Sequence, residues 1–140
     1  MKIICRVLSD KAVNAAPNNI KPLYATASGR CILAQLPKTE IDGIVDIYGF
    51  PEDSWNNISS RTALEKELEK IRNEKIITVI SEEREVVAIG AIIDAPEKYA
   101  PLAIGLFLPL YRFAPARRNS FIKLIKEYTN KISLYLNKQN

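Results

Sequence analysis

The stretch from Pro22 to Pro37 constrains the fold more than any other part of the chain; it reads Pro-Leu-Tyr-Ala-Thr-Ala-Ser-Gly-Arg-Cys-Ile-Leu-Ala-Gln-Leu-Pro. A proline disfavours the helical region for the residue before it, so the stretch begins extended. Thr26 is an expected N-cap, because its hydroxyl can accept a hydrogen bond from a free N–H of the first helical turn. The stretch therefore predicts a turn from extended chain into a helix that runs to about Leu36.

This predicted helix carries a narrow seam of small side chains. Ala27, Cys31 and Ala34 recur at helical spacing on one side of it. Gly29 lies one turn into the helix, where glycine costs about 1 kcal/mol relative to alanine. We therefore expect another part of the chain to approach the backbone closely at Gly29.

The first backbone N–H groups of the helix, at Ala27 and Ser28, form a candidate anion site. Unpaired donors and the positive end of the helix dipole coincide at a helix N-terminus. Two interpretations are open. Water or a neighbouring loop satisfies these groups, as at most helix ends, or they bind an anionic ligand.

Length and composition suit one domain with a single core, since the chain has 140 residues of which 47% are hydrophobic. No apolar run approaches the roughly 20 residues that span a bilayer, and the first residues are too short and too charged for a signal peptide. Cys5 and Cys31 lie far apart in apolar patterns and are expected to be reduced thiols. We expect a cytoplasmic location and no membrane contact.

The net charge of +4 raises the question of nucleic acid. The basic residues are interleaved with glutamates, and no compact helix-turn-helix pattern is present, so we expect no DNA binding by this chain alone. Histidine is absent, which removes the commonest general base and zinc ligand. No phosphate-binding or dinucleotide-binding fingerprint occurs. An enzyme, a metal and a cofactor are therefore not expected.

The remaining chain divides into alternating helical and extended patterns. Residues 2–8 are expected to form a strand and 9–21 an irregular crossing. Thr39 is the expected cap of a second helix, with Ile41, Ile44, Val45 and Tyr48 on its buried face and Gly49 at its end. Trp55 lies in a polar loop and is interpreted as a plug of the core edge rather than a ligand contact.

The second half predicts a third helix, three strands and a long last helix. Ser59 or Ser60 caps the third helix, whose buried stripe is Leu64, Leu68 and Ile71. The strands are expected at 76–80, 86–93 and 102–108, and their short connections imply antiparallel neighbours. The last helix is expected at 116–137, with an apolar stripe of Phe121, Leu124, Ile125, Tyr128, Ile132, Tyr135 and Leu136.

The opening stretch resembles the signature region of the effector-binding domain of IclR-type bacterial transcriptional regulators. That family typically reads Pro-Leu-His-Ala-Thr-Ala-x-Gly-Lys here, followed by a helix ending Leu-Ala-x-Leu; this chain has Tyr24 for the histidine and Arg30 for the lysine. Further elements follow in the family's order: the helix with Leu64, Leu68, Ile71 and Arg72, the pair Glu82-Glu83, strands ending at Asp94 and Pro109, and the last helix. The resemblance runs from about Lys2 to about Leu136.

The resemblance implies an α+β domain, GAF-like or profilin-like, with helices packed on a mainly antiparallel sheet. It implies a sensor of a small carboxylic or aromatic acid that assembles into a homodimer or homotetramer. Residues 1–140 would be a single effector-binding domain without the winged helix-turn-helix that binds the operator in whole regulators. Either the chain is a portion of a longer regulator, or its gene lacks the DNA-binding half. Tyr111, Phe113 and Tyr135 are expected at the surface, where they favour self-association.

The resemblance also names a candidate effector site. Family members hold a small carboxylate with backbone N–H groups that correspond to Ala27 and Ser28. They complete the site with an aspartate, which aligns near Ile80 or Ser81 here, and with a cysteine and two serines, whose positions align with Ala88, Gly105 and Phe107. Residues i and i+2 of a strand share a face, so Gly105 and Phe107 are expected to look the same way. Two interpretations stay open: a pocket reshaped for a more apolar acid, or a filled core in a degenerate sensor that acts only as an assembly module.

Overall fold

The computed structural model describes residues 23–139. The elements in chain order are the 3-10 turn η1 (Leu23–Ala25), α1 (Ala27–Ala34), α2 (Lys38–Tyr48), α3 (Arg61–Glu74), β1 (Ile76–Ser81), β2 (Val86–Ile93), β3 (Leu102–Pro109), the 3-10 turn η2 (Leu110–Arg112) and α4 (Pro115–Lys138). The expected strand at 2–8, the crossing at 9–21 and Cys5 lie outside the described residues.

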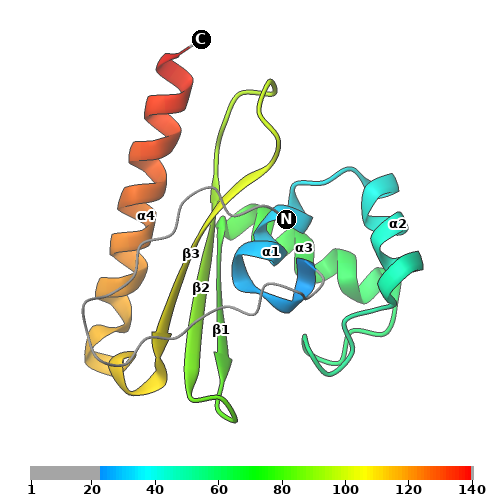
Figure 1. The fold of residues 1–140 in the computed structure, drawn as a ribbon, viewed down its shortest axis with the longest axis horizontal. Coiled ribbons are helices and arrows are strands. Elements are labelled where there is room, and N and C mark those ends of the chain that lie inside the picture. Colours follow the sequence, from blue (N-terminus) through cyan, green and yellow to red (C-terminus); the bar gives the residue numbers. More distant parts are fainter. Residues whose placement is uncertain (1–22, 140) are drawn as a thin grey trace.

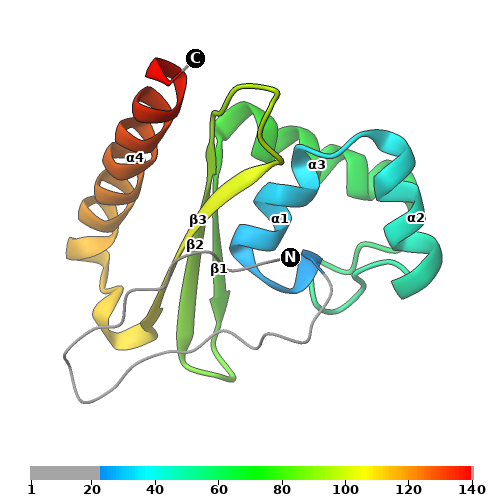
Figure 2. The same ribbon diagram turned by 45° about the horizontal axis from the view of Figure 1, so that its top comes forward.

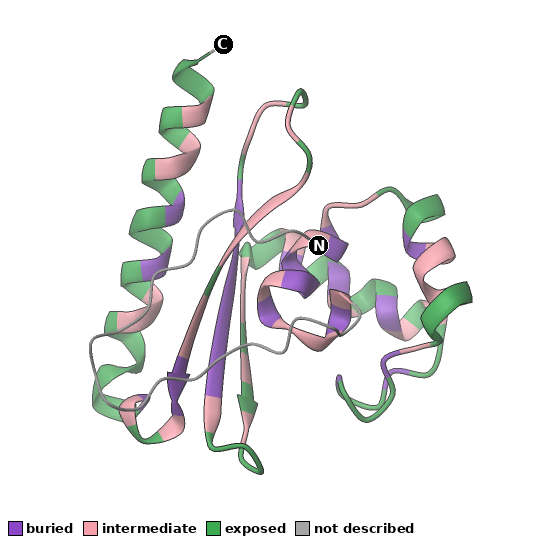
Figure 3. Ribbon diagram, viewed as in Figure 1, coloured by how far each residue is buried: buried purple, intermediate pink, exposed green. Residues whose placement is uncertain are grey.

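The three strands form an antiparallel sheet in the order β1-β2-β3, as the short connections predicted. Helix α4 lies along one face of the sheet, while α1 lies on the other, with α3 and α2 beyond it (Figures 1 and 2). Strand β2 is the central strand and is buried along nearly its whole length (Figure 3). The structure is therefore a layered α+β domain in which β2 is covered from both sides.

Alternation along the strands divides the core in two. Val87, Ile89 and Ala91 face α4, where they pack with residues that include Ile125. The intervening residues of β2 face α1, and Ile92 joins the larger cluster on that side. That cluster contains Tyr24, Cys31, Leu33, Ala34, Ile41, Trp55, Ile58, Leu64, Leu68, Ile71 and Ile92.

Several local predictions are confirmed. Thr26 caps α1, and its hydroxyl accepts a hydrogen bond from the N–H of Gly29 at 3.0 Å. Ser60 caps α3 in the same way, accepting from the N–H of Ala63. A Cβ on Gly29 would lie 2.0 Å from the carbonyl oxygen of Leu23. The expected close approach at Gly29 is therefore the turn η1 folding back against α1.

The prediction for α2 was partly wrong. Pro37, not Thr39, occupies the N-cap position, and no side chain caps the helix. Ile41 is buried and Ile44 and Val45 pack partly buried against the core, as predicted, whereas Tyr48 is exposed. Gly49 ends the helix as predicted, with a φ of 76° that favours glycine.

The predicted stripe of α4 is wider than its buried face. Ile125 is buried, as predicted, together with Thr129, whose hydroxyl donates to the carbonyl of Ile125. Leu124 and Tyr128 are exposed instead, and Tyr135 is exposed too, as its expected position at the surface predicted. The sheet therefore covers one line of this helix and leaves the flank beside it open.

Of the two aromatic residues near the start of α4 that were expected at the surface, one is exposed and the other is buried. Tyr111 is exposed as predicted, with 68% of its surface accessible, whereas Phe113 is 3% exposed and lies in the core under α4. Phe113 was therefore wrongly expected at the surface.

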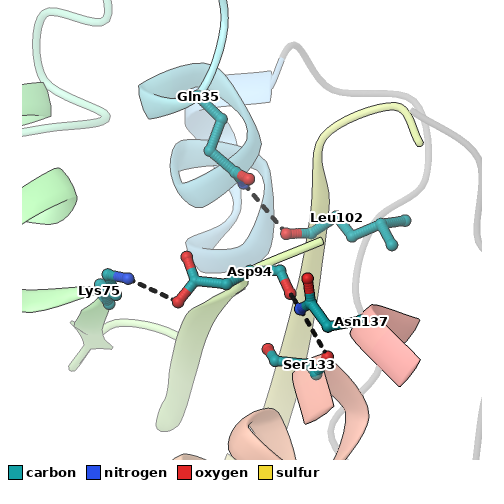
Figure 4. A network of polar contacts seen from close by, with 6 residues as sticks. All are labelled: Gln35, Lys75, Asp94, Leu102, Ser133 and Asn137. Atoms are coloured by element: carbon teal, nitrogen blue, oxygen red, sulfur yellow. Dashed lines mark hydrogen bonds and ion pairs between the residues drawn. The ribbon is translucent and has the colours of Figure 1, made fainter. Parts of the chain in front are cut away.

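A polar network joins the helices to one end of the strands (Figure 4). The side-chain amide of Gln35, just after α1, donates to the carbonyl of Leu102 at the start of β3. The amide of Asn137 in α4 donates to the carbonyl of Asp94, and the Asp94 carboxylate pairs with Lys75 at the end of α3. These contacts lie at one end of the strands, so both helical layers are tied to the same end of the sheet.

Within residues 23–139, no helix combines the length and the apolar character that crossing a membrane requires.

Candidate functional site

The N-terminus of α1 rests on a pair of glycines in the sheet. Gly90 of β2 and Gly105 of β3 are cross-strand partners. A Cβ on Gly90 would lie 2.5 Å from the carbonyl oxygen of Ala27 and 2.8 Å from the backbone nitrogen of Ser28. A Cβ on Gly105 would lie 3.3 Å from the Cβ and Oγ of Ser28. The two glycines therefore let the start of the helix approach the strands at backbone distance.

The backbone donors predicted for this site are free of partners within the described part of the chain. The N–H of Gly29 donates to the Thr26 hydroxyl, and that of Arg30 donates to the Thr26 carbonyl. Among residues 23–139, none accepts a hydrogen bond from the N–H of Ala27 or Ser28. The first turn of α1 therefore presents two donors at the positive end of the helix dipole.

Ala88 and Phe107 adjoin the glycine pair on the same face of the sheet. They are cross-strand partners, two residues along each strand from Gly90 and Gly105. Ala88 is buried, and the Cε2 atom of Phe107 lies 3.5 Å from the Cβ position at Gly105. The structure thus brings together all five predicted residues, and the half-buried ring of Phe107 leans over the glycine. None of the strand residues offers a polar side chain.

The sequence did not predict the contacts of Arg30, called here the Arg30 clamp, which fix the turn η1 on the side away from the sheet. The buried Arg30 donates from Nε to the carbonyl of Tyr24 at 2.7 Å and from Nη2 to the carbonyl of Ser54 at 2.6 Å. Its guanidinium lies 4.5 Å from the centroid of the Trp55 ring. Burial lowers the pKa of Arg30 to about 10, opposed by the negative charge of Glu67. The side chain therefore stays charged at neutral pH and joins η1 to the loop after α2.

Tyr24 forms a second tie to the same region. Its hydroxyl donates to the carbonyls of Tyr48 and Gly49, at 3.0 and 3.2 Å. Burial raises the pKa of this hydroxyl above its ordinary value.

Trp55 is 2% exposed, which confirms its interpretation as a core residue. A glycine inside a predicted strand was the signal that could have found Gly90. No local signal marks Ser54 and Trp55 as partners of Arg30, because they lie far from it along the chain.

Two surface hollows lie away from this site. One, of about 410 Å³, lies between α2 and α3 and is lined by residues that include Lys38, Arg61 and Glu69. The other, of about 390 Å³, lies at the far end of α1, beside Arg72 and Asp94. Both mix charges of both signs. In residues 23–139 no group of three acidic or cysteine side chains is placed to hold a metal.

A comparison with family models decides the relationship of this chain to known proteins. Residues 10–134 match the family described as bacterial transcriptional regulator IclR, C-terminal. The chain belongs to this family. IclR proteins are transcription regulators, a family that is not enzymatic. The comparison with curated proteins gave no match.

Solved structures of IclR-type regulators share the fold. A transcriptional regulator from Rhodococcus sp. RHA1, RHA06195, is 22% identical with a TM-score of 0.76, covering 96% of this chain and 56% of that protein. IclR from Thermotoga maritima is 28% identical with a TM-score of 0.61, covering 81% of this chain and 47% of that protein. The chain thus spans about half the length of such regulators.

A third solved structure is that of an isolated sensor domain. The inducer-binding domain of the Acinetobacter transcription factor PobR, a double mutant in complex with 3-hydroxybenzoic acid, is 18% identical with a TM-score of 0.68. The match covers 89% of this chain and 74% of that domain. The expected α+β, GAF-like architecture is confirmed by these likenesses and by the antiparallel sheet.

Proposed function

We propose that this chain is the ligand-sensing and self-associating domain of an IclR-type transcription regulator, and that it binds a small organic acid at the N-terminus of α1. One observation carries the proposal: the N–H groups of Ala27 and Ser28 have no acceptor among the described residues, and they lie beside Gly90 and Gly105. A carboxylate provides the acceptors and the negative charge that this position favours.

The surroundings of these donors favour an acid with an apolar body. Ala88, Gly105 and Phe107 cannot donate a side-chain hydrogen bond to a hydroxyl or to a second carboxylate. Each buried CH₂ group of a ligand contributes roughly 0.8 kcal/mol. The 3-hydroxybenzoic acid held by the PobR domain is an aromatic acid, which supports the same class here. Bulkier apolar acids should therefore bind better than glyoxylate or pyruvate.

Titration calorimetry against benzoate, hexanoate, glyoxylate and pyruvate tests this proposal. We expect benzoate or hexanoate to bind and to raise the melting temperature, since a ligand of the native state stabilises it by mass action. Replacing Gly105 and Phe107 by serine should shift the preference towards glyoxylate. Tight glyoxylate or pyruvate binding to the unaltered protein would contradict the proposed ligand class.

The second candidate function is an assembly module that has lost its ligand. The position of the Phe107 ring favours it, since its Cε2 atom lies 3.5 Å from the Cβ position at Gly105 and so fills space over that glycine. A ring that stays there leaves no room for a ligand body. In that case no member of the acid panel changes the melting temperature, and self-association remains the measurable activity.

The proposed regulator domain acts as a homodimer or homotetramer in the cytoplasm, and this chain alone does not bind duplex DNA specifically. Exposed apolar side chains on α4 support self-association. Light scattering over a range of concentrations measures the mass, and we expect at least a dimer. A sequence-selective complex in a gel shift with the chain's own promoter region would contradict the expectation for DNA.

A further inference from the structure

Helix α4 presents an apolar stripe that the sheet leaves uncovered. Leu124, Tyr128 and Tyr135 are 46%, 51% and 64% exposed. Together with Lys131 they recur at alternating steps of four and three residues, which is the spacing of a seam between helices packed side by side. The stripe therefore has the form of a helix-packing surface, and none of the helices described in residues 23–139 covers it.

The charge of α4 restricts what can cover this stripe. Its basic residues are Arg117, Arg118, Lys123, Lys126, Lys131 and Lys138, against a single acidic residue, Glu127. In residues 23–114, by contrast, acidic residues outnumber basic ones. Two α4 helices facing each other would repel, since like charges across an interface are costly. The stripe therefore fits an acidic helix better than a second α4.

Helix α2 offers such an acidic surface. Ile47 and Tyr48 are exposed at 75% and 59%, and the exposed Asp46 precedes them. None of the described residues forms an ion pair with Asp46. A Cβ on Gly43 would meet nothing within 4 Å, so no packing among residues 23–139 accounts for a glycine in the middle of this helix. Glycine there costs about 1 kcal/mol, but it lets another backbone come close.

We propose that the stripe of α4 in one copy of the chain docks on the exposed face of α2 in a second copy. The two helices lie at opposite ends of the molecule, so they cannot pair within one chain (Figures 1 and 2). Apolar side chains meet apolar side chains, while Lys131, which also pairs with Glu127 of its own helix, and its basic neighbours meet Asp46. The contact is head-to-tail and joins two different surfaces, so it closes a ring or extends a chain of copies. This assignment rests on the self-association proposed above and identifies the two surfaces that would meet in it.

Sedimentation equilibrium of the charge-reversed variants Lys131→Glu and Asp46→Lys tests the contact. Each alone should weaken self-association about tenfold, because it places like charges across the interface. Mixing the two should restore association, since the intact α4 of Asp46→Lys meets the intact α2 of Lys131→Glu. Lys66→Glu on α3 is the matched control; it changes the net charge as Lys131→Glu does, but lies outside both surfaces and should associate like the unaltered chain.

Salt and ligand binding separate the possible outcomes. Higher salt should weaken a head-to-tail contact between opposite charges. Association that strengthens with salt or with Lys131→Glu would show α4 pairing with α4 and overturn the assignment, while leaving self-association intact. A monomer at every concentration would overturn both. Calorimetry with benzoate tests the ligand-sensing part of the proposed function independently of these results.

Discussion

The backbone nitrogen of Ser28 lies 2.8 Å from the point where a Cβ on Gly90 would stand. This distance is shorter than real Cβ atoms tolerate, and the obstructing atoms belong to the backbone of α1, not to a flexible side chain. The candidate ligand site therefore depends on a glycine that contributes no contact of its own.

Gly90→Ala should destabilise the domain by about 1–3 kcal/mol, the range for forcing an extra methyl group into packed structure. The helix start must move away from the sheet, so acid binding should fall as well. Chemical denaturation followed by Trp55 fluorescence measures the free energy of unfolding. Gly105→Ala should cost less stability than Gly90→Ala, because its Cβ would lie 3.3 Å from Ser28 side-chain atoms that can adjust.

Gly43→Ala is the matched control in α2, where a Cβ meets nothing within 4 Å. At a protein concentration low enough for monomers, it should stabilise the chain by about 0.4–1 kcal/mol through lost freedom of the unfolded state. Equal effects of Gly90→Ala and Gly43→Ala would contradict the close approach of α1 to the sheet.

The contacts of Arg30 should contribute more to the free energy of unfolding than those of an exposed charged side chain. Arg30→Met leaves the carbonyls of Tyr24 and Ser54 without their donor and removes the cation above Trp55. Hydrogen bonds to charged groups contribute about 1.5–3 kcal/mol each, so we expect a loss of this order. Trp55 emission should shift to the red as the loop detaches. Arg84→Met, in the exposed turn between β1 and β2, should change neither the free energy of unfolding nor the emission.

Local chemistry explains which parts of the fold were predictable. The caps Thr26 and Ser60 and the full length of β2 follow from residues within one turn or strand of each other. The partners of Arg30 do not, since Ser54 lies 24 positions away and its carbonyl carries no sequence signal. Thr39 failed as a cap because Pro37, with φ fixed by its ring, already provides an extended residue before the helix.

The candidate site was predictable in its members but not in its geometry. Family resemblance and strand alternation selected Ala88, Gly105 and Phe107, which do share a face. Neither could show how close α1 lies to Gly90, because that distance is set by packing between distant elements. The same limit applies to α4, where helical periodicity marks Leu124, Tyr128 and Tyr135 as apolar but does not reveal how wide the covering sheet is.

The Cys31 thiol should make stability depend on pH in the alkaline range. Burial raises its pKa to about 12 from an ordinary value of 9.0. The folded state therefore holds the proton where the unfolded state releases it. The stability contributed by the neutral thiol is fully present below about pH 9 and is lost as pH rises towards 12, by up to about 1.4 kcal/mol per pH unit.

Denaturation at pH 8 and pH 10 in a Cys5→Ser background measures this dependence, and Cys31→Ala in the same background supplies the control. The unaltered Cys31 should lose more stability between the two pH values than the alanine variant does. In native protein at pH 8 the thiol should also resist a disulfide reagent until the chain unfolds. Rapid labelling of native Cys31 would contradict its burial.

Phe107 decides between the two proposed functions, because its ring and the side chain of Ser28 at the start of α1 both lie within 3.5 Å of the Cβ position at Gly105. Phe107→Ala removes the ring that leans over Gly105 and opens space for a ligand body. If benzoate binds the unaltered chain against this ring, as proposed, its affinity should fall about tenfold in Phe107→Ala, since losing the contact of two CH₂ equivalents costs roughly 1.6 kcal/mol. Phe121→Ala, which removes a ring from the opposite face of the sheet, should leave the affinity unchanged. If benzoate binds Phe107→Ala but not the unaltered chain, the ring closes the site and the domain acts as an assembly module. If benzoate binds neither, the donors at the start of α1 are not an acid site.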